Sequence, residues 1–323
     1  MGTGGSVLAV DLGGTNLRVA AIAPDGRILE RRSAPTRAEE GPSAVITRMG
    51  ALCDAVAEVA GIAKDAPIGV ASPGPLDPRT GVVLFTPNLP GWRDVPLGPM
   101  LSVSTNRPVR VSNDANCAAL GEARFGAAAG MHDVVYLGLG TGVGGGLILD
   151  GRLYEGGFGM GVELGHVTVS TDGPRCTCGG IGCLEAYVAG WAIAREAHLV
   201  CTTVDGDRIR AIAGSESPDA RAVTLAAAEG DPAARAILAR AGLALGAAIG
   251  AFINIFNPEA IVIGGGLSAT GEALLAPARE AIPSYSFQGL RAPAAILAAT
   301  LGDDNGLIGA GALALEQSER VGR

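Results

Sequence analysis

The chain has 323 residues, of which 48% are hydrophobic and 17% charged, and its formal net charge at pH 7 is −8. This length and apolar content allow two domains with buried cores and argue against an intrinsically disordered chain. The negative charge disfavours nucleic acid or an acidic membrane surface as the main partner. Lys64 is the only lysine, so a phosphate-loop lysine or a Schiff-base mechanism is also disfavoured.

The N-terminal part predicts strands and one helix. Two apolar runs flank a glycine turn, which indicates a hairpin of strands over Val7–Asp11 and Leu17–Ala23. Helical periodicity follows over residues 43–60, and a buried strand is expected at residues 68–71. Residues 76–83 then predict a small hairpin in a long turn-rich region, and loops of that length are usually functional.

Strands and helices alternate in the rest of the chain. The expected elements are strands at residues 109–112, 134–139, 146–149 and 260–263, and helices at residues 114–125, 307–316 and, mostly, 185–256. With hairpins opening two separate segments, this order predicts an α/β architecture with two related halves.

The longest uncharged run covers residues 241–258, and two asparagines interrupt it. A membrane span needs about 20 apolar residues, so we expect a buried helix instead. Its glycines recur every four residues and form one face for close packing, at Gly242, Gly246 and Gly250. Because the first residues also lack the basic and apolar regions of a signal peptide, we expect a soluble cytoplasmic protein with reduced thiols.

The segment GLGTGVGGG contains a formal GxGxxG, but a dinucleotide-binding fingerprint must open a helix. Here a strand follows, so the dinucleotide reading is rejected. A glycine turn between two strands can still wrap backbone N–H groups around phosphate oxygens. DLGGTN has the same form and a third glycine run follows Ile263, so we favour a phosphate clamp over plain hairpin turns.

Asp114 follows a predicted strand and begins a predicted helix. In open α/β sheets, ligands bind in the crevice at such strand ends. The helix N-terminus would keep this carboxylate ionised, as a general base requires, and a simple helix cap is the alternative. Asn113 beside it could bind a polar substrate.

Three of the six cysteines fall within eight residues, in a C-x-C-x4-C cluster that follows His166 by ten residues. Three thiolates and one imidazole form a complete tetrahedral zinc set, and chance clustering is the alternative. The set leaves no open position, so the metal would be structural. The proposed ligands are His166, Cys176, Cys178 and Cys183.

In these features the chain resembles the ROK family of sugar kinases and sugar-responsive repressors. The shared motifs occur in the same order along nearly the whole chain: DLGGT (11–15), SPGPLD (72–77), TPNLPGW (86–92), NDAN (113–116), GTGVGGG (140–146), ELGH (163–166), CTCGGIGCLE (176–185) and IVIGGG (261–266). The resemblance implies an actin-like fold of two ribonuclease-H-like domains with a cleft between them. The smaller domain would span residues 1–115, rejoined by a helix at residues 305–323, and the larger domain residues 116–304.

The resemblance also implies roles for individual residues. Asp114 would be the catalytic base and His166 a ligand of zinc. The sugar hydroxyls would be bound by Asn88, Asn113, Glu163, His166 and Glu185, with Gly74 lining the pocket. The nucleotide phosphates and Mg²⁺ would lie at Asp11, Gly13, Thr15, Gly140, Thr141 and Gly142, and the adenosine at Gly264 and Gly265. Val162 departs from the family, which often has glycine at this position.

The implied activity is ATP-dependent phosphorylation of a hexose at its 6-hydroxyl, with glucokinase as the expected member. An N-acetylmannosamine or N-acetylglucosamine kinase is the alternative within the class. A repressor of this family would carry a winged-helix domain ahead of the DxGGT motif, and a non-catalytic sugar sensor would not need Asp114 or the phosphate loops. The expected partners are a hexose, ATP and further copies of the chain in a dimer or tetramer, without nucleic acid or membrane.

Overall fold

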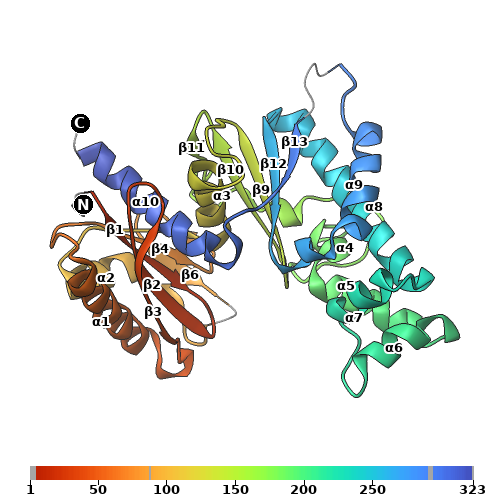
Figure 1. Cartoon of the computed structure of the whole chain (residues 1–323), viewed down its shortest axis with the longest axis horizontal. Helices are drawn as coiled ribbons and strands as arrows, with labels where there is room; N and C mark the ends of the chain where they lie inside the picture. Colours follow the sequence, from red (N-terminus) through yellow and green to blue (C-terminus); the bar gives the residue numbers. More distant parts are fainter. Residues whose placement is uncertain (1–4, 87–88, 290–293, 322–323) are drawn as a thin grey trace. The chain divides into compact units, whose positions relative to one another are not determined.

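The structure is a computed structural model, and it describes residues 5–86, 89–289 and 294–321. By its internal contacts the chain divides into two compact units, whose helices and strands are labelled in Figure 1. Unit 1 consists of Met1–His132, Gly146–Val162 and Ala299–Arg323, and unit 2 of Asp133–Gly145 and Glu163–Ala298. This division keeps residues 116–132 in unit 1, whereas the sequence placed the start of the second domain at residue 116.

Unit 1 is built on a five-stranded sheet of β1 (Val7–Leu12), β2 (Asn16–Ile22), β3 (Ile28–Pro35), β4 (Ile68–Ser72) and β8 (Val109–Asn113). The strand order is β3-β2-β1-β4-β8. β1 and β2 pair antiparallel around the glycine turn, which confirms the predicted hairpin. β4 lies parallel to β1, and β8 lies parallel to β4, so the carboxyl ends of these three strands share one edge of the sheet.

The two faces of this sheet carry different helices (Figure 1). Large side chains of β1 and β4 form one apolar cluster with α1 (Pro42–Ala60). The opposite face is lined by small residues: a Cβ at Gly69 would lie 1.8 Å from the carbonyl oxygen of Ala310. This close approach lets α10 (Asn305–Val321) pack directly on β1 and β4, with α3 (Asp114–Phe125) beside it.

A small sheet and two short helices complete the N-terminal part. The sheet contains β5 (Leu76–Asp77), β6 (Val82–Phe85) and β7 (Arg93–Val95) in that order. β5 and β6 pair antiparallel, as the sequence predicted for residues 76–83, and β7 adds a third strand. The helices are η1 (Ala38–Glu40) and α2 (Leu97–Thr105).

The second sheet has the order β11-β10-β9-β12-β13. Its strands are β9 (Val134–Leu139), β10 (Val143–Leu149), β11 (Arg152–Leu153), β12 (Ala260–Gly264) and β13 (Ala295–Ala298). β9, β12 and β13 run parallel, whereas β10 and β11 form an antiparallel hairpin. β10 begins three residues before the predicted strand because its glycine-rich start already has extended backbone.

Most helices of unit 2 lie within residues 185–256, the stretch that the sequence predicted as mostly helical, and one further helix lies beyond it. They are α4 (Glu185–Val188), α5 (Gly190–Val200), α6 (Asp207–Ala213), α7 (Ala220–Ala228), α8 (Pro232–Phe256) and α9 (Glu272–Tyr285), with short turns η2 (Leu164–His166), η3 (Val204–Gly206) and η4 (Gly266–Thr270). In unit 1, η5 (Gly302–Asp304) precedes α10.

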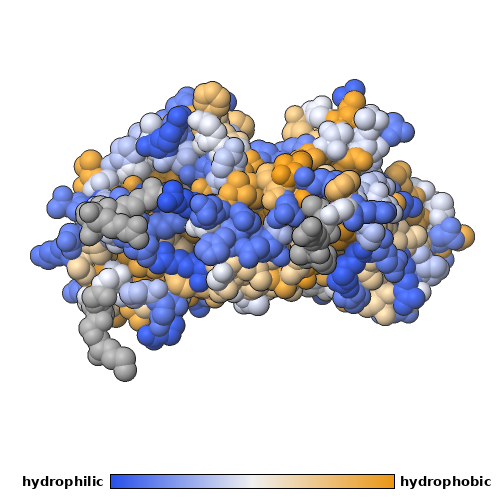
Figure 2. All heavy atoms as spheres, turned by 90° about the horizontal axis from the view of Figure 1, so that it is seen from above, coloured by the Kyte–Doolittle hydropathy of each residue, from blue (hydrophilic) through white to orange (hydrophobic). Residues whose placement is uncertain are grey.

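α8 is long and apolar enough to cross a membrane by length and composition, but 67% of its most apolar window is buried inside the protein. The glycines recurring every four residues face α9: a Cβ at Gly246 would lie 2.3 Å from the carbonyl oxygen of Ala278. This close contact confirms the predicted packing face, so α8 is a core helix. On the face drawn in Figure 2, hydrophobic and hydrophilic residues are interspersed, as is ordinary for a folded surface.

Candidate functional site

Asn113 and Asp114 lie where β8 ends and α3 begins. Asn113 has extended backbone, and its side-chain oxygen accepts a hydrogen bond from the backbone N–H of Ala115 at 2.9 Å, so it caps the helix. Asp114 Oδ1 accepts from the same N–H at 2.8 Å, and the side chain is exposed. The partial positive charge of the helix N-terminus favours an ionised carboxylate at this position.

Gly74 packs against Asn113, since a Cβ at Gly74 would lie 3.6 Å from Nδ2 of that amide. A side chain at position 74 would therefore compete with any ligand of Asn113. Asn88, which the sequence placed with these two residues, lies outside the described residues.

Other carboxylates belong to the same region of unit 1. Burial raises the pKa of the Cys117 thiol well above its usual value, and the negative charges of Asp114, Asp11 and Glu155 raise it further. All three carboxylates therefore lie near the first turn of α3. The sequence analysis did not identify Glu155, whose Oε1 accepts a hydrogen bond from the Ser112 hydroxyl at 2.6 Å.

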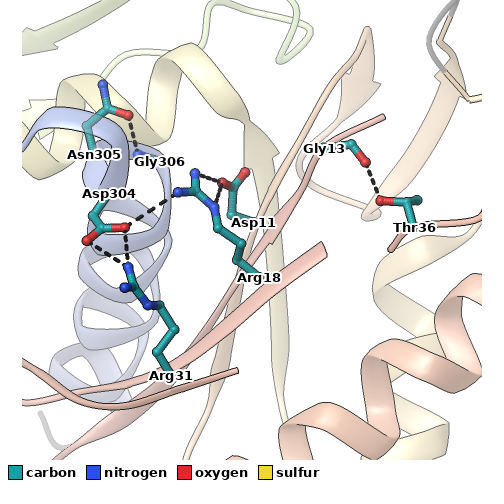
Figure 3. Close-up of polar contacts among 8 residues, drawn as sticks. All are labelled: Asp11, Gly13, Arg18, Arg31, Thr36, Asp304, Asn305 and Gly306. Atoms are coloured by element: carbon teal, nitrogen blue, oxygen red, sulfur yellow. Dashed lines mark hydrogen bonds and ion pairs between the residues drawn. The ribbon is translucent and has the colours of Figure 1, made fainter. Parts of the chain in front are cut away.

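Asp11 is the penultimate residue of β1, just before the turn that contains Thr15. The turn is tight: a Cβ at Gly13 would lie 2.9 Å from the carbonyl oxygen of Asn16. Thr36 holds it in place, because its hydroxyl donates to the Gly13 carbonyl at 2.7 Å (Figure 3). Its N–H also donates to the Thr15 carbonyl at 2.8 Å. The first predicted phosphate loop is therefore a well-held hairpin at the same sheet edge as Asp114.

The second predicted phosphate loop connects β9 to β10 in unit 2. The Gly140 N–H donates to the Gly142 carbonyl at 2.9 Å, and the segment continues as a strand, which confirms the rejection of a dinucleotide fingerprint. Gly190 N–H donates to the Gly140 carbonyl at 2.9 Å, so the start of α5 fixes the turn. Thr141 at its tip is exposed.

Gly264 and Gly265 lie beside this loop, at the end of β12. β12 runs parallel to β9, with Gly264 opposite Gly138. Gly265 has a φ of +83°, and a Cβ there would lie 2.2 Å from the carbonyl oxygen of Leu139. Both the backbone conformation and the lack of space therefore exclude a side chain at this position. The structure thus brings the two glycine-rich segments of unit 2 together.

The four predicted metal ligands also come together in unit 2. Their ligand atoms all lie within 4.8 Å of one another. The Sγ atoms of Cys178 and Cys183 are 3.7 Å apart, and the Cys176 Sγ is 3.7 Å from Nδ1 of His166. Tetrahedral zinc with Zn–S bonds of about 2.3 Å separates its sulfurs by about 3.8 Å, so the donor set and the spacing fit that metal.

The thiols of this cluster differ in acidity. Burial raises the pKa of Cys183 to about 12 and also raises the pKa of Cys176. The Gly180 N–H, which donates to the exposed Cys178 sulfur at 3.4 Å, lowers the pKa of that thiol. Burial therefore disfavours the thiolate forms of Cys176 and Cys183, and a bound cation would favour them.

Glu185 is buried and joins the cysteine loop to the glycine loop. Its Oε1 accepts a hydrogen bond from the Thr177 hydroxyl at 3.2 Å and lies 3.7 Å from the Cys176 sulfur. Its Oε2 accepts from the Val143 N–H at 3.0 Å. The carboxylate therefore fixes two loops that the sequence treated as separate sites.

Glu163 and His166 belong to the short η2 segment. The His166 N–H donates to the Glu163 carbonyl at 2.9 Å, and the Glu163 side chain is exposed. Gly165 packs on β10, because a Cβ there would lie 2.1 Å from the Val143 carbonyl oxygen. Val162 has a φ of +69°, a left-handed conformation that is unfavourable for a β-branched residue.

The candidate residues thus divide between the units. Unit 1 holds the set Asp11, Gly13, Thr15, Gly74, Asn113 and Asp114, and unit 2 holds Gly140, Thr141, Gly142, Glu163, His166, Cys176, Cys178, Cys183, Glu185, Gly264 and Gly265. Sequence reasoning missed Arg18, although hairpin register alone places it opposite Asp11.

Comparison with known proteins places the sequence in one protein family. The sequence profile of the ROK family matches residues 7–317. A glucokinase from Thermotoga maritima is 40% identical over 318 residues, covering 98% of both chains.

Two solved structures are similar over almost the whole chain. A ROK hexokinase from Thermus thermophilus has a TM-score of 0.85 at 36% identity, covering 98% of this chain and 99% of its own. A ROK glucokinase from Streptomyces griseus, in complex with glucose and AMPPNP, has a TM-score of 0.79 at 34% identity, covering 96% and 99%. The α/β fold is therefore the actin-like two-domain fold that the sequence predicted.

Proposed function

The chain belongs to the ROK family, and we propose that it is a glucokinase, which transfers the terminal phosphoryl group of ATP to the 6-hydroxyl of glucose. The observation that carries the proposal is the meeting of Asp114 and the Asp11 turn at one edge of the unit 1 sheet. A general base and a phosphate loop at the same strand ends are what phosphoryl transfer to a hydroxyl needs. The full-length likeness to glucokinases supports glucose as the acceptor.

Asp114 is the general base in this proposal. Its carboxylate would accept the proton of the sugar 6-hydroxyl while that oxygen forms its bond to phosphorus and ADP leaves. General-base contributions are typically about 10²–10⁴-fold in rate. The helix N-terminus at Ala115 keeps the carboxylate ionised and fixes its direction.

Residues that bind sugar hydroxyls are proposed in each unit. Asn113, with Gly74 leaving room beside it, would bind a hydroxyl from unit 1. Glu163, His166 and Glu185 would bind hydroxyls from unit 2, and Asn88 completes the proposed set from outside the described residues.

The nucleotide is proposed to lie on the glycine turns. Gly13, Thr15, Gly140, Thr141 and Gly142 would offer N–H groups and hydroxyls to phosphate oxygens, and the adenosine would lie at Gly264 and Gly265. The Asp11 carboxylate fits magnesium, which prefers oxygen ligands and uses one or two carboxylates. When bound, magnesium neutralises negative charge on the transferring phosphates.

A structural zinc ion is proposed at His166, Cys176, Cys178 and Cys183, on the fit of donor types and spacing. His166 would bind it through Nδ1, because that is the ring nitrogen 3.7 Å from the Cys176 sulfur. This leaves Nε2 for a sugar hydroxyl. The ion supplies no chemistry in the reaction and holds the loop that carries Glu185.

The cellular location, the partners and the assembly of the protein are also proposed. Glucokinase chemistry, a net charge of −8 and a buried α8 favour a cytoplasmic enzyme of carbohydrate metabolism without nucleic acid or membrane partners. A homodimer or homotetramer is the proposed assembly, because the resemblance to the ROK family implies one of these.

A panel of sugars in a coupled ADP-release assay tests the function. We expect glucose to give the highest kcat/KM with Mg-ATP, ahead of mannose, N-acetylmannosamine and N-acetylglucosamine. Higher kcat/KM for an N-acetyl sugar would make the protein an N-acetylhexosamine kinase instead. Sugar binding without ADP release would contradict a kinase and favour a sugar sensor.

A further inference from the structure

Arg18 binds the carboxylate of Asp11 directly. The two residues are register partners in the β1–β2 hairpin, so their side chains lie on the same face of the sheet. Both Nε, at 3.0 Å, and Nη2 of Arg18 donate to the same atom, Oδ2 of Asp11 (Figure 3). Among the described residues, no hydrogen bond to the other oxygen, Oδ1, is formed.

A second carboxylate fixes the guanidinium from its other side. Arg18 Nη1 lies 3.5 Å from Oδ1 of Asp304, just ahead of α10. Arg31 on β3 holds Asp304 more closely, since its Nη1 donates to both carboxylate oxygens at 2.9 and 3.1 Å. Figure 3 shows the resulting chain of alternating charges from Arg31 to Asp11.

The first turn of α10 approaches Asp11 from a third direction. A Cβ at Gly306 would lie 3.7 Å from the carboxylate carbon and Oδ1 of Asp11 and 3.8 Å from Oδ2, in ordinary van der Waals contact with the whole group. Glycine at this position therefore keeps the space beside the carboxylate free of a side chain. The carboxylate is held by Arg18 on Oδ2 alone, and no side chain of residue 306 lies beside it.

Partial exposure limits how much this network adds to folding stability. The Arg18 side chain is 29% exposed and that of Asp11 is 15% exposed, and partly exposed ion pairs contribute little to stability. Two donors converging on one oxygen instead fix the orientation of the carboxylate.

We propose that Arg18 is a positioning residue for the magnesium–nucleotide: it occupies Oδ2 of Asp11, so that only Oδ1 is available to the metal or to a water bound to it. The inference rests on the proposed function, because it assumes that Asp11 serves magnesium. Single-oxygen contact suits magnesium, which keeps several of its waters and demands near-octahedral geometry. The partners of metal-binding carboxylates orient them, and their loss typically costs about 10–100-fold in metal affinity.

Calorimetric titration with ADP over a series of magnesium concentrations tests the inference without turnover. The variants are Arg18→Met, which removes the donors, Arg18→Lys, which keeps the charge but not the two-pronged geometry, and Arg31→Met as the matched control one step along the network. Arg18→Met should raise the magnesium concentration for half-maximal ADP affinity about tenfold or more. Arg18→Lys should raise it by a smaller factor, Arg31→Met should leave it within about twofold of the wild type, and the affinity for glucose should not change in any of them.

Three outcomes would contradict the proposal in distinguishable ways. A wild-type magnesium requirement in both Arg18 variants would overturn the positioning role and leave the kinase assignment intact. Equal shifts in Arg18→Met and Arg31→Met would mean that the network is only structural. If the wild type itself bound no Mg-ADP, the proposed function would fail together with this inference. If thermal unfolding shows that Arg18→Met does not fold, the magnesium requirement of Arg18→Lys alone tests the positioning role.

Discussion

Glu185 accepts a hydrogen bond from the backbone N–H of Val143 at 3.0 Å, and this contact ties the loop of three cysteines to the glycine turn between β9 and β10. The other carboxylate oxygen accepts from the Thr177 hydroxyl at 3.2 Å. A buried acid that bridges two loops makes the geometry of one depend on the other. The cysteine loop therefore influences the proposed nucleotide side of the site as well as the sugar side.

Replacing Glu185 by leucine should destabilise the protein. The substitution leaves the Val143 N–H without its partner in a buried position, at a cost of about 1–3 kcal/mol. We expect the free energy of unfolding in urea to fall by that amount.

Glu185→Gln is the matched control for this experiment. Its amide oxygen can accept from Val143 while its NH₂ group donates to Thr177, whose hydroxyl can reorient, so its stability should stay near that of the wild type. Equal losses in the two variants would show that the charge matters and the bridge does not.

Asp114→Asn should separate chemistry from binding. The amide keeps the size of the side chain but cannot take the hydroxyl proton, so kcat should fall by about 10²–10⁴-fold. The dissociation constant for glucose, measured by calorimetry, should change only a few-fold. A variant with kcat near that of the wild type would contradict the role of Asp114 as the base.

Asn113→Ala changes the residue next to Asp114, and we expect it to weaken sugar binding more than it slows the chemical step. It removes a helix cap, which costs about 1 kcal/mol of stability, and a proposed sugar contact. KM for glucose should rise more than kcat falls. A loss confined to kcat would mean that Asn113 serves the chemistry and not the sugar.

Local patterns predicted the parts of this fold that depend on neighbouring residues. The β1–β2 hairpin and the glycine face of α8 were predictable, because turn chemistry and side-chain periodicity are properties of short segments. α9 was missed, since Pro277 and Pro283 lie inside it and proline argues against a helix interior.

Contacts between distant segments were not predictable from those patterns. Glu122 is fully buried, and its carboxylate accepts hydrogen bonds from the N–H groups of Ala127, Thr300 and Leu301 at 2.8 to 3.1 Å. Nothing in the sequence near Glu122 indicates a partner 178 residues away. The bridge from Glu185 to Val143 was hidden for the same reason, because it depends on which loops become neighbours in space.

The six cysteines should fall into distinct classes of reactivity. Burial raises the pKa of Cys53 to about 12 and that of Cys117 well above its usual value, so both should stay unreactive toward a thiol reagent in the native protein at neutral pH. Metal would protect the three clustered thiols. After chelation, the exposed Cys178, whose pKa is lowered, should react first.

Mass spectrometry after brief alkylation, with and without a chelator, measures these classes. Elemental analysis of the native protein should find about one zinc per chain. Cys176→Ser should lower this content, whereas Cys201→Ser, outside the cluster, should not. Native protein without bound metal, or with Cys178 alkylated as fast before chelation as after it, would contradict the zinc site.

Val162 should be a strained position next to the proposed sugar-binding Glu163. Its φ of +69° places a β-branched side chain in the left-handed region, at a cost of about 1–3 kcal/mol. Glycine adopts this conformation freely but loses about 0.5–1 kcal/mol through the greater freedom of its unfolded chain. Val162→Gly should therefore raise the free energy of unfolding slightly, by up to about 2 kcal/mol.

Val167→Gly is the matched control, because Val167 lies in the same segment with an ordinary φ of −65°. That substitution relieves no strain and should lower stability by about 0.5–1 kcal/mol. Urea unfolding of both variants measures the difference, and glucose KM should change mainly in Val162→Gly, since relaxing Val162 frees the backbone that directs Glu163. If the two variants lose stability equally, Val162 stores no strain, and the loop beside Glu163 is shaped by its packing on Val143.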